Sequence, residues 1–277
     1  MVTLVLTESG TFRDIAHLFH FVELLFVGVV KLWKSGLNVQ DVDIISIPHW
    51  TNESWKGKFH NHNLKIFEKV FENVKICHTN FEKDSKDVIW VDRAECDKGE
   101  MNKMWAKYID SFDPYKWYNA FHLTGCIPRP HPVVTYISRQ GGGRRCLSDE
   151  THRNILQFLK NVSDILFIPI QMEDHNFEQQ INVAHSTDLL IGGHGNGLTH
   201  MAFMQPHRNV VEIFPSGMPF QYDYYTLAKM MGHEYTCIYS GGPAFIHGLD
   251  VNSAPSVTDK FDMTVMELII KQIKKLH

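Results

Sequence analysis

The sequence lacks the marks of several common protein classes. Its 5 cysteines include no C-x-x-C pair and its 17 histidines no H-E-x-x-H, so neither familiar zinc signature is present. The apolar stretch FVELLFVGVV is interrupted by Glu23 and reaches about half of the roughly 20 residues that a membrane-spanning helix needs. The net charge of −4 offers no excess of positive charge to a nucleic acid or a membrane surface. We expect a globular protein with no bound metal, no nucleic-acid partner and no membrane segment.

Strand-like and helix-like segments alternate along both halves of the chain. This alternation is typical of an α/β fold in which a parallel sheet has helices on both faces. In the C-terminal half, the pattern predicts strands at 133–138, 164–170, 188–193, 209–215 and 234–239 and helices at 148–162, 177–187, 197–204 and 222–232. In the N-terminal half, it predicts strands at 2–8 and 41–48 and helices at 13–36 and 63–74. We therefore expect two Rossmann-like lobes.

The stretch LTGCIPRPHPV, with three prolines in residues 128–132, is the best candidate for a boundary between the lobes. We place the first lobe at residues 1–126 and the second at 127–277. A final helix at 261–277 either completes the second lobe or returns to the first.

A glycine-rich turn follows one of the predicted strands. In IGGHGNGLTH, Gly193, Gly195 and Gly197 allow a sharp turn directly before a predicted helix. Ligands of open parallel sheets bind beyond the carboxyl ends of the strands, and the first amides of a helix attract anions. A phosphate group suits this turn, although a plain tight turn would use glycine as well.

A second loop at the same sheet edge is basic. Arg139, Arg144 and Arg145 lie in SRQGGGRR, and arginine is suited to bidentate phosphate contacts, although a solvated basic loop has the same composition. Two anion-seeking loops at one edge favour a diphosphate. Glu212, near the end of the next strand, either accepts hydrogen bonds from a ribose or pairs with a nearby base. The Asp-x-Asp motif DVD at 41–43 precedes its strand, which is the wrong order for a metal-dependent glycosyltransferase.

The chain resembles the glycosyltransferases of family 61 in three segments: VTYISRQGGGRRCLSDE, STDLLIGGHGNGLTHMAFMQPHRNVVEIFP and YTLAKMMGHEYTCI. The H-G-x-G-L-T-H core and the V-V-E strand after it are the most specific part, and the branch with the EGF-domain-specific O-linked N-acetylglucosamine transferase is the most similar. The resemblance implies a GT-B fold, with a cleft between an acceptor-side first lobe and a nucleotide-sugar-binding second lobe. It also implies an inverting reaction that needs no metal or other cofactor.

The resemblance also implies which residues bind the sugar donor: Arg139, Arg144, His194, Gly195, Asn196, Gly197, Thr199 and Glu212. Asn196 departs from the family pattern, which more often has alanine there. The N-terminal segment DIAHLFHFVELL is similar to a family segment with a histidine and a nearby acid. Because acids common in relatives fall on His20, Phe21 or Val22, the candidates for the catalytic base are His17, His20 and Glu23. A core histidine is the alternative for His17.

These features predict an inverting transfer of a sugar, best matched by N-acetylglucosamine, from a UDP-sugar to a hydroxyl of a protein or glycan. The alternatives are a xylosyl- or arabinosyltransferase acting on a polysaccharide and an inactive protein that binds nucleotide sugars. The opening MVTLVLTESG has no basic start and too short an apolar run for a signal peptide. The compartment stays open: the lumen of the endoplasmic reticulum or Golgi if a targeting segment precedes Met1, and otherwise the cytosol.

Overall fold

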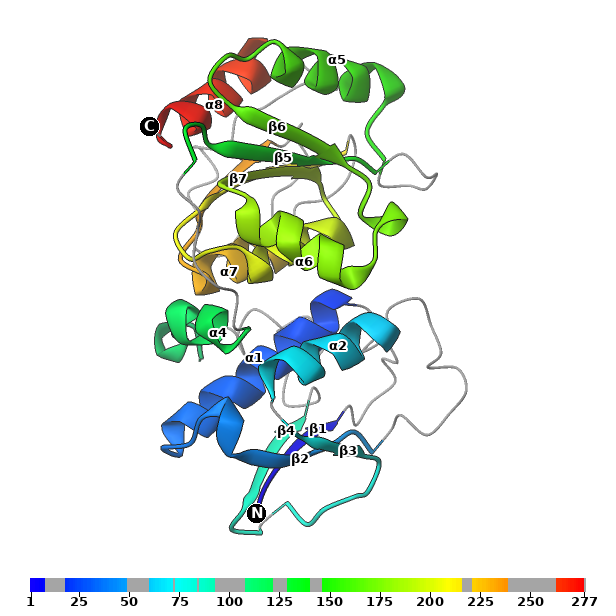
Figure 1. Ribbon diagram of the computed structural model, residues 1–277, viewed down its shortest axis with the longest axis vertical. Coiled ribbons are helices and arrows are strands. Elements are labelled where there is room, and N and C mark those ends of the chain that lie inside the picture. Colours follow the sequence, from blue (N-terminus) through cyan, green and yellow to red (C-terminus); the bar gives the residue numbers. More distant parts are fainter. Residues whose placement is uncertain are drawn as a thin grey trace. The chain divides into compact units, whose positions relative to one another are not determined.

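The chain forms two compact units, Met1–Leu123 and Thr124–His277, close to the boundary predicted after residue 126. The computed structural model (Figure 1) describes residues 1–7, 18–48, 60–71, 73–83, 85–92, 108–121, 129–139, 146–215, 221–238 and 263–276. Each unit contains a sheet whose neighbouring strands are all parallel. The predicted α/β class is therefore confirmed.

The N-terminal unit has a four-stranded sheet with the order β3-β2-β1-β4. Its strands are β1 (Val2–Thr7), β2 (Val42–Ser46), β3 (Lys75–Cys77) and β4 (Val88–Asp92). Its helices are α1 (Leu18–Lys34), α2 (His60–Val70) and α4 (Pro114–Ala120), with short 3₁₀ turns η1 (Val39–Asp41) and η4 (Ile109–Ser111). The sequence analysis did not predict β3, which has only 3 residues, or β4, which has 5.

Helix α1 lies against the middle of this sheet. A Cβ atom added at Gly28 would lie 3.2 Å from Leu4 Cδ1 and 3.4 Å from Val91 Cγ2, so the helix backbone closely approaches β1 and β4. Helix α2 packs beside α1 (Figure 1). Since α1 follows β1 in the chain and crosses back over it, its first turns lie toward the carboxyl edge of the sheet.

The C-terminal unit has a five-stranded sheet with the order β6-β5-β7-β8-β9. Its strands are β5 (Val133–Ile137), β6 (Leu166–Ile170), β7 (Leu189–Gly193), β8 (Asn209–Ile213) and β9 (Glu234–Ile238). Its helices are α5 (Asp149–Lys160), α6 (Phe177–Ser186), α7 (Asp223–Met230) and α8 (Met263–Lys274), with 3₁₀ segments η5 (Met172–Asp174) and η6 (Asn196–Phe203). Helices α5 and α8 cover one face of the sheet, and α6 and α7 lie on the other (Figure 1).

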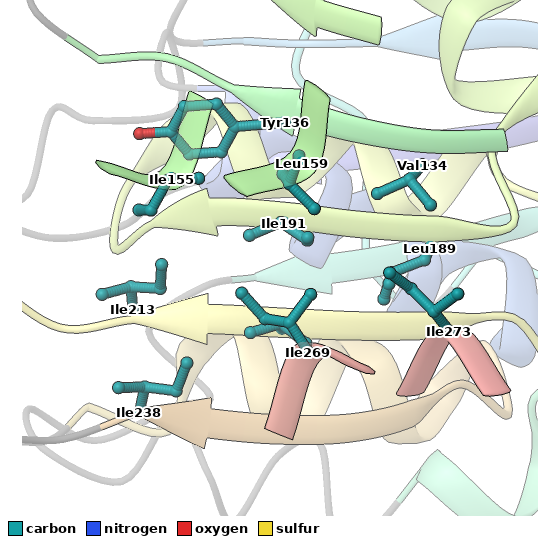
Figure 2. Packing of buried hydrophobic residues seen from close by; sticks show 11 residues of the cluster. Val134, Tyr136, Ile155, Leu159, Leu189, Ile191, Ile213, Ile238, Ile269 and Ile273 are labelled. Atoms are coloured by element: carbon teal, nitrogen blue, oxygen red, sulfur yellow. The ribbon is translucent and has the colours of Figure 1, made fainter. Parts of the chain in front are cut away.

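The core of the C-terminal unit fills the space between the sheet and helices α5 and α8. Figure 2 shows the strand side chains, among them Ile191 and Ile213, facing Ile155 of α5 and Ile269 of α8. Ile273, one turn after Ile269, is also buried there. Helix α8 therefore packs on the sheet of the C-terminal unit.

Local sequence signals fix two helix starts in this lobe. Ser148 Oγ accepts the Thr151 amide at 3.1 Å, and Asp149 and Glu150 occupy the first turn of α5, where negative charge suits the helix dipole. At α6, Asn176 and Gln179 exchange backbone and side-chain hydrogen bonds as a capping box. The helix predicted from residue 148 therefore begins at a capping serine.

His233 ties η6 to β8 from within the core. Its Nε2–H donates to the Met201 carbonyl at 3.0 Å, and its Nδ1 accepts the Arg208 amide at 3.1 Å. A second ring proton would face the Arg208 N–H group, so the neutral ring fits this place. Burial lowers the pKa of His233 from 6.5 to about 4.

Acidification should therefore destabilise the fold through His233. Between pH 6.5 and 4, the His233 ring is protonated in the unfolded chain but not in the folded chain. The stability that the neutral ring contributes is therefore fully present above pH 6.5 and is lost as the pH falls toward 4. Between about pH 7.5 and 5.0, we expect this group to remove about 2 kcal/mol from the free energy of unfolding, measured by urea titration. His233→Gln keeps one donor and one acceptor but does not titrate, and its stability should fall by that much less. An equal fall in both proteins would contradict the assignment.

Candidate functional site

The order of the C-terminal strands creates a switch point at the carboxyl ends of β5 and β7. The chain leaves β5 toward β6 on one side, while β7 lies on the other side of β5. The connections that follow these two neighbouring strands therefore depart in opposite directions, and ligands of such sheets usually bind at this point. Arg139 follows β5, and the turn His194–Gly195 follows β7.

Arg139 lies directly on the glycine turn. Its Nη1 donates to the His194 carbonyl oxygen at 3.0 Å. Gly195 has φ 151° and ψ 179°, a conformation that only glycine adopts readily, and a Cβ atom there would lie 1.8 Å from Arg139 Nη1. The structure thus brings Arg139, the described arginine of the predicted basic loop, into contact with the predicted glycine turn. Arg144 and Arg145 lie outside the described residues.

The segment after the turn is a 3₁₀ helix, where the sequence predicted an ordinary helix at 197–204. Its ladder begins with the Leu198 amide, which donates to the Gly195 carbonyl at 2.9 Å. Residues Leu198 to Phe203 are all buried, so packing on several sides overrides the local preference. Gly197 allows the close fit, because a Cβ there would lie 2.9 Å from Ile137 Cγ2. The first amides of this segment precede the ladder, and such amides bind anions at other helix starts.

Two other candidates from the sequence lie in this 3₁₀ segment. Thr199 is fully buried, and its hydroxyl donates to Asn196 Oδ1 at 3.2 Å. This contact orients the Asn196 side chain, which is half-buried at the turn. Thr199 therefore acts on the site through Asn196 rather than by presenting its own hydroxyl.

Glu212 lies at the centre of a buried polar chain behind the turn. Its Oε1 lies 2.5 Å from His194 Nδ1, and its Oε2 accepts the Tyr235 hydroxyl. Burial raises the pKa of the Glu212 carboxyl, and the hydrogen bonds from His194 and Tyr235 offset part of the rise. Two roles were predicted for Glu212, hydrogen bonding to a ribose and pairing with a base. The structure pairs it with the His194 ring. The His194 ring is further held by Phe214, stacked at 5.0 Å, and by the edge of Tyr224 at 5.2 Å.

The N-terminal sheet has a switch point of its own, between β1 and β4. Thr7 and Asp92, the last residues of these strands, are partners in register. Sequence reasoning missed Asp92, although the apolar run VIWV directly before it was a usable signal. On α1, which follows β1, His20 Nδ1 lies 3.3 Å from Glu23 Oε2. Glu23 is buried, whereas the His20 side chain is 19% exposed. His17 lies outside the described residues.

The described contacts of the DVD motif are structural: both of its carboxylates accept backbone amides. Asp43 Oδ2 accepts the Val2 amide at 2.7 Å, and Asp41 Oδ2 accepts the Asn38 amide at 2.6 Å. Both lie at the amino end of β2, opposite to the sheet edge where ligands bind. Within the described part of the chain, no group of three histidine, cysteine or acidic side chains is placed to hold a metal ion. Among the same residues, no helix has the length and apolar character to cross a membrane.

A parallel sheet with an arginine on a glycine turn at its switch point is typical of Rossmann-like α/β proteins. More narrowly, residues 19–211 match the family described as Glycosyltransferase 61, and the chain belongs to this family. The predicted family is thus confirmed.

Individual relatives match a shorter stretch. The EGF domain-specific O-linked N-acetylglucosamine transferase of Bos taurus is 30% identical over 104 residues, which is 37% of this chain and 19% of that protein. The protein of the same name from Mus musculus is 29% identical over 104 residues, with the same shares. The one from Drosophila melanogaster is 29% identical over 108 residues, 39% of this chain and 20% of its own. The similarity therefore spans about a fifth of the length of these relatives.

The buried chain around Glu212 should be needed for the stability of the C-terminal lobe. Glu212→Ala leaves the His194 ring and the Tyr235 hydroxyl without their shared partner, and we expect it to cost about 3–5 kcal/mol in the free energy of unfolding. Tyr235→Phe removes one hydrogen bond and leaves the carboxyl paired with His194, which should cost about 1–2 kcal/mol. Urea unfolding of both variants measures the difference. Equal losses would show that Glu212 does not hold the two groups together.

Proposed function

We propose that the protein is an inverting glycosyltransferase that moves a sugar from a UDP-sugar to a hydroxyl group of a protein or glycan. The observation that supports it most directly is Arg139, held over the Gly195 turn at the switch point of the C-terminal sheet. Membership of family 61 supports the reaction class. The relatives named above support N-acetylglucosamine as the sugar and a protein as the acceptor.

In this proposal, the diphosphate of the donor binds at the carboxyl ends of β5 and β7. The Arg139 guanidinium supplies a permanent positive charge, and the amides at the start of η6 supply hydrogen-bond donors. The leaving UDP gains negative charge as its bond to the sugar breaks. These groups neutralise that charge without a metal ion or other cofactor, and removing one such preorganised donor typically costs about 3–4 kcal/mol in the barrier.

The N-terminal lobe is proposed to bind the acceptor, in the GT-B arrangement that the two Rossmann-like sheets support. Inversion requires one displacement, in which the acceptor oxygen attacks the anomeric carbon opposite the leaving diphosphate and gives its proton to a base. We assign that base to His20, because Glu23 is more deeply buried beside it and is placed to orient the ring through Nδ1. His20 Nε2 then takes the proton. Asp92, at the switch point of the same sheet, is the second candidate.

Sugar-donor binding should depend on Arg139 and on the absence of a side chain at Gly195. At 100 times its dissociation constant, UDP should add about 2.7 kcal/mol of stability in a thermal scan with and without EDTA. We expect Arg139→Ala to abolish the shift, because the diphosphate loses its fixed cation. UDP-N-acetylglucosamine, UDP-xylose and UDP-arabinose, tested beside UDP, rank the sugars.

Gly195→Ala tests the same site, with Gly36→Ala as its matched control. Gly36 also has a positive φ, of 76°, but nothing lies within 4 Å of the position that its Cβ would take. Both variants should lose about 1–2 kcal/mol of stability because alanine strains a positive φ. Only Gly195→Ala should lose UDP binding, since its Cβ displaces Arg139. Normal UDP binding by Gly195→Ala or Arg139→Ala would rule out this site.

Turnover should depend on His20 in a way that UDP binding does not. His20→Ala should lower kcat by about 100-fold or more while the UDP thermal shift is kept, because the base acts on the acceptor. Glu23→Gln should lower kcat less, since it only weakens the orientation of the ring. Asp92→Asn distinguishes the second candidate: a loss in this variant with normal His20→Ala turnover would reverse the assignment. UDP binding without transfer to any acceptor or water would instead favour the inactive binding protein.

A further inference from the structure

A second histidine of the glycine-rich segment, His200, lies buried beneath the turn with both ring nitrogens against oxygen atoms. Its Nδ1 is 2.8 Å from the Gly197 carbonyl oxygen, and its Nε2 is 2.8 Å from Gln180 Oε1. The Phe203 ring meets it edge-on at 6.0 Å. A carbonyl oxygen accepts only, so the nitrogen beside Gly197 must donate if this contact is a hydrogen bond.

The other contact depends on which way the Gln180 amide is turned, and the surroundings of that amide decide it. Gln180 Nε2 donates to the Met172 carbonyl at 2.7 Å and to the His175 carbonyl at 2.9 Å. Turning the amide over would set its oxygen against these two carbonyl oxygens and lose both bonds. The atom that faces His200 Nε2 is therefore the amide oxygen, which also accepts only.

From these two contacts we infer that His200 is doubly protonated and places a positive charge beneath the diphosphate-binding turn. A neutral ring has one donor and one acceptor, and either tautomer would set a nitrogen lone pair 2.8 Å from an oxygen. His233, also buried against η6, gives the contrast: its nitrogens face one acceptor and one donor, so it suits the neutral ring.

Because of its position, the charge on His200 contributes to binding of the sugar donor. This role rests on the proposed function. The peptide between Gly197 and Leu198 is held at both ends, its carbonyl by His200 and its amide by the Gly195 carbonyl. His200 thus fixes the turn and adds to the positive potential there, together with Arg139. The other charged or titratable side chains of the turn and of the elements packed on η6 are His194, His233, Glu178, His185, Asp223, Tyr224, Tyr225 and Lys229. His200 acts through the turn and is a positioning residue.

The protonation state is measured first, without any ligand. In the free protein with ¹⁵N-labelled histidine at about pH 6.5, long-range proton–nitrogen spectra distinguish an imidazolium, with two protonated nitrogens, from a neutral ring. The His200 signals are those that disappear in His200→Gln, and His233→Gln identifies the neutral reference in the same way. We expect two protonated nitrogens at His200 and one at His233. An unprotonated nitrogen at His200 would overturn the inference, whether or not the protein binds UDP.

The pH dependence of UDP binding then tests the role of the charge. Above about pH 7 the phosphate ionisation of UDP is nearly complete, so a further fall in affinity up to about pH 9 reports groups on the protein. We expect wild type and His233→Gln to lose affinity over this range as His200 gives up its proton. His200→Gln should bind UDP about tenfold more weakly at pH 7 and show a flatter profile.

The outcomes separate the charge from the proposed function. An imidazolium at His200 with unchanged UDP affinity and pH profile in His200→Gln would overturn its part in binding. Absence of UDP binding by the wild type would overturn the proposed function and, with it, the role of His200 in binding UDP. The spectra would still establish the buried charge. A change in unfolding stability alone, without a change in the pH profile, would reduce His200 to a structural residue and count against the inference.

Discussion

The site depends on one close contact, in which the guanidinium group of Arg139 occupies the space that a Cβ atom would take at position 195. Arg139 reaches the His194 carbonyl only because Gly195 has no Cβ, and Gly195 is held at its positive φ by the strand before it and the 3₁₀ helix after it. The contact joins the loops that follow β5 and β7 across the switch point. It therefore fixes the spacing of the two loops before any ligand binds, which is the preorganisation that electrostatic catalysis requires.

Behind this contact, the protein builds its polar interior from histidines in different settings. His194 faces a buried carboxyl, His233 faces one donor and one acceptor, and His200 faces two acceptors. The side chain is the same in all three, so the hydrogen bonds that each ring makes follow from the partners that the fold supplies. Burial makes these partners decisive, since an unpaired polar atom in the interior costs far more than one in water.

Much of this arrangement was predictable from local sequence, and the remainder depends on tertiary packing. Alternating strands and helices and the Ser148 cap follow from patterns within a few residues. The approach of Arg139 to the glycine turn was predictable for another reason, because both follow strands of one parallel sheet. The form of η6 does not, because burial on several sides imposes the tighter helix. The burial of Glu212 could not be foreseen either, since its partner Tyr235 is 23 residues away in the chain. Asp92 was missed although the apolar run VIWV directly before it indicates a strand.

Helix α8 has a consequence for how the C-terminal lobe can be separated from the rest of the chain. It closes the core over the sheet with Ile269 and Ile273 (Figure 2). Gln272 of the same helix donates to Thr236 Oγ1 of β9 at 2.7 Å. A fragment that stopped at the end of β9 would contain every strand of the sheet and the whole glycine turn. It would also expose a face of isoleucine side chains to water. The smallest fragment that keeps this core closed therefore extends through α8, and this last helix is as much a part of the lobe as its first strand.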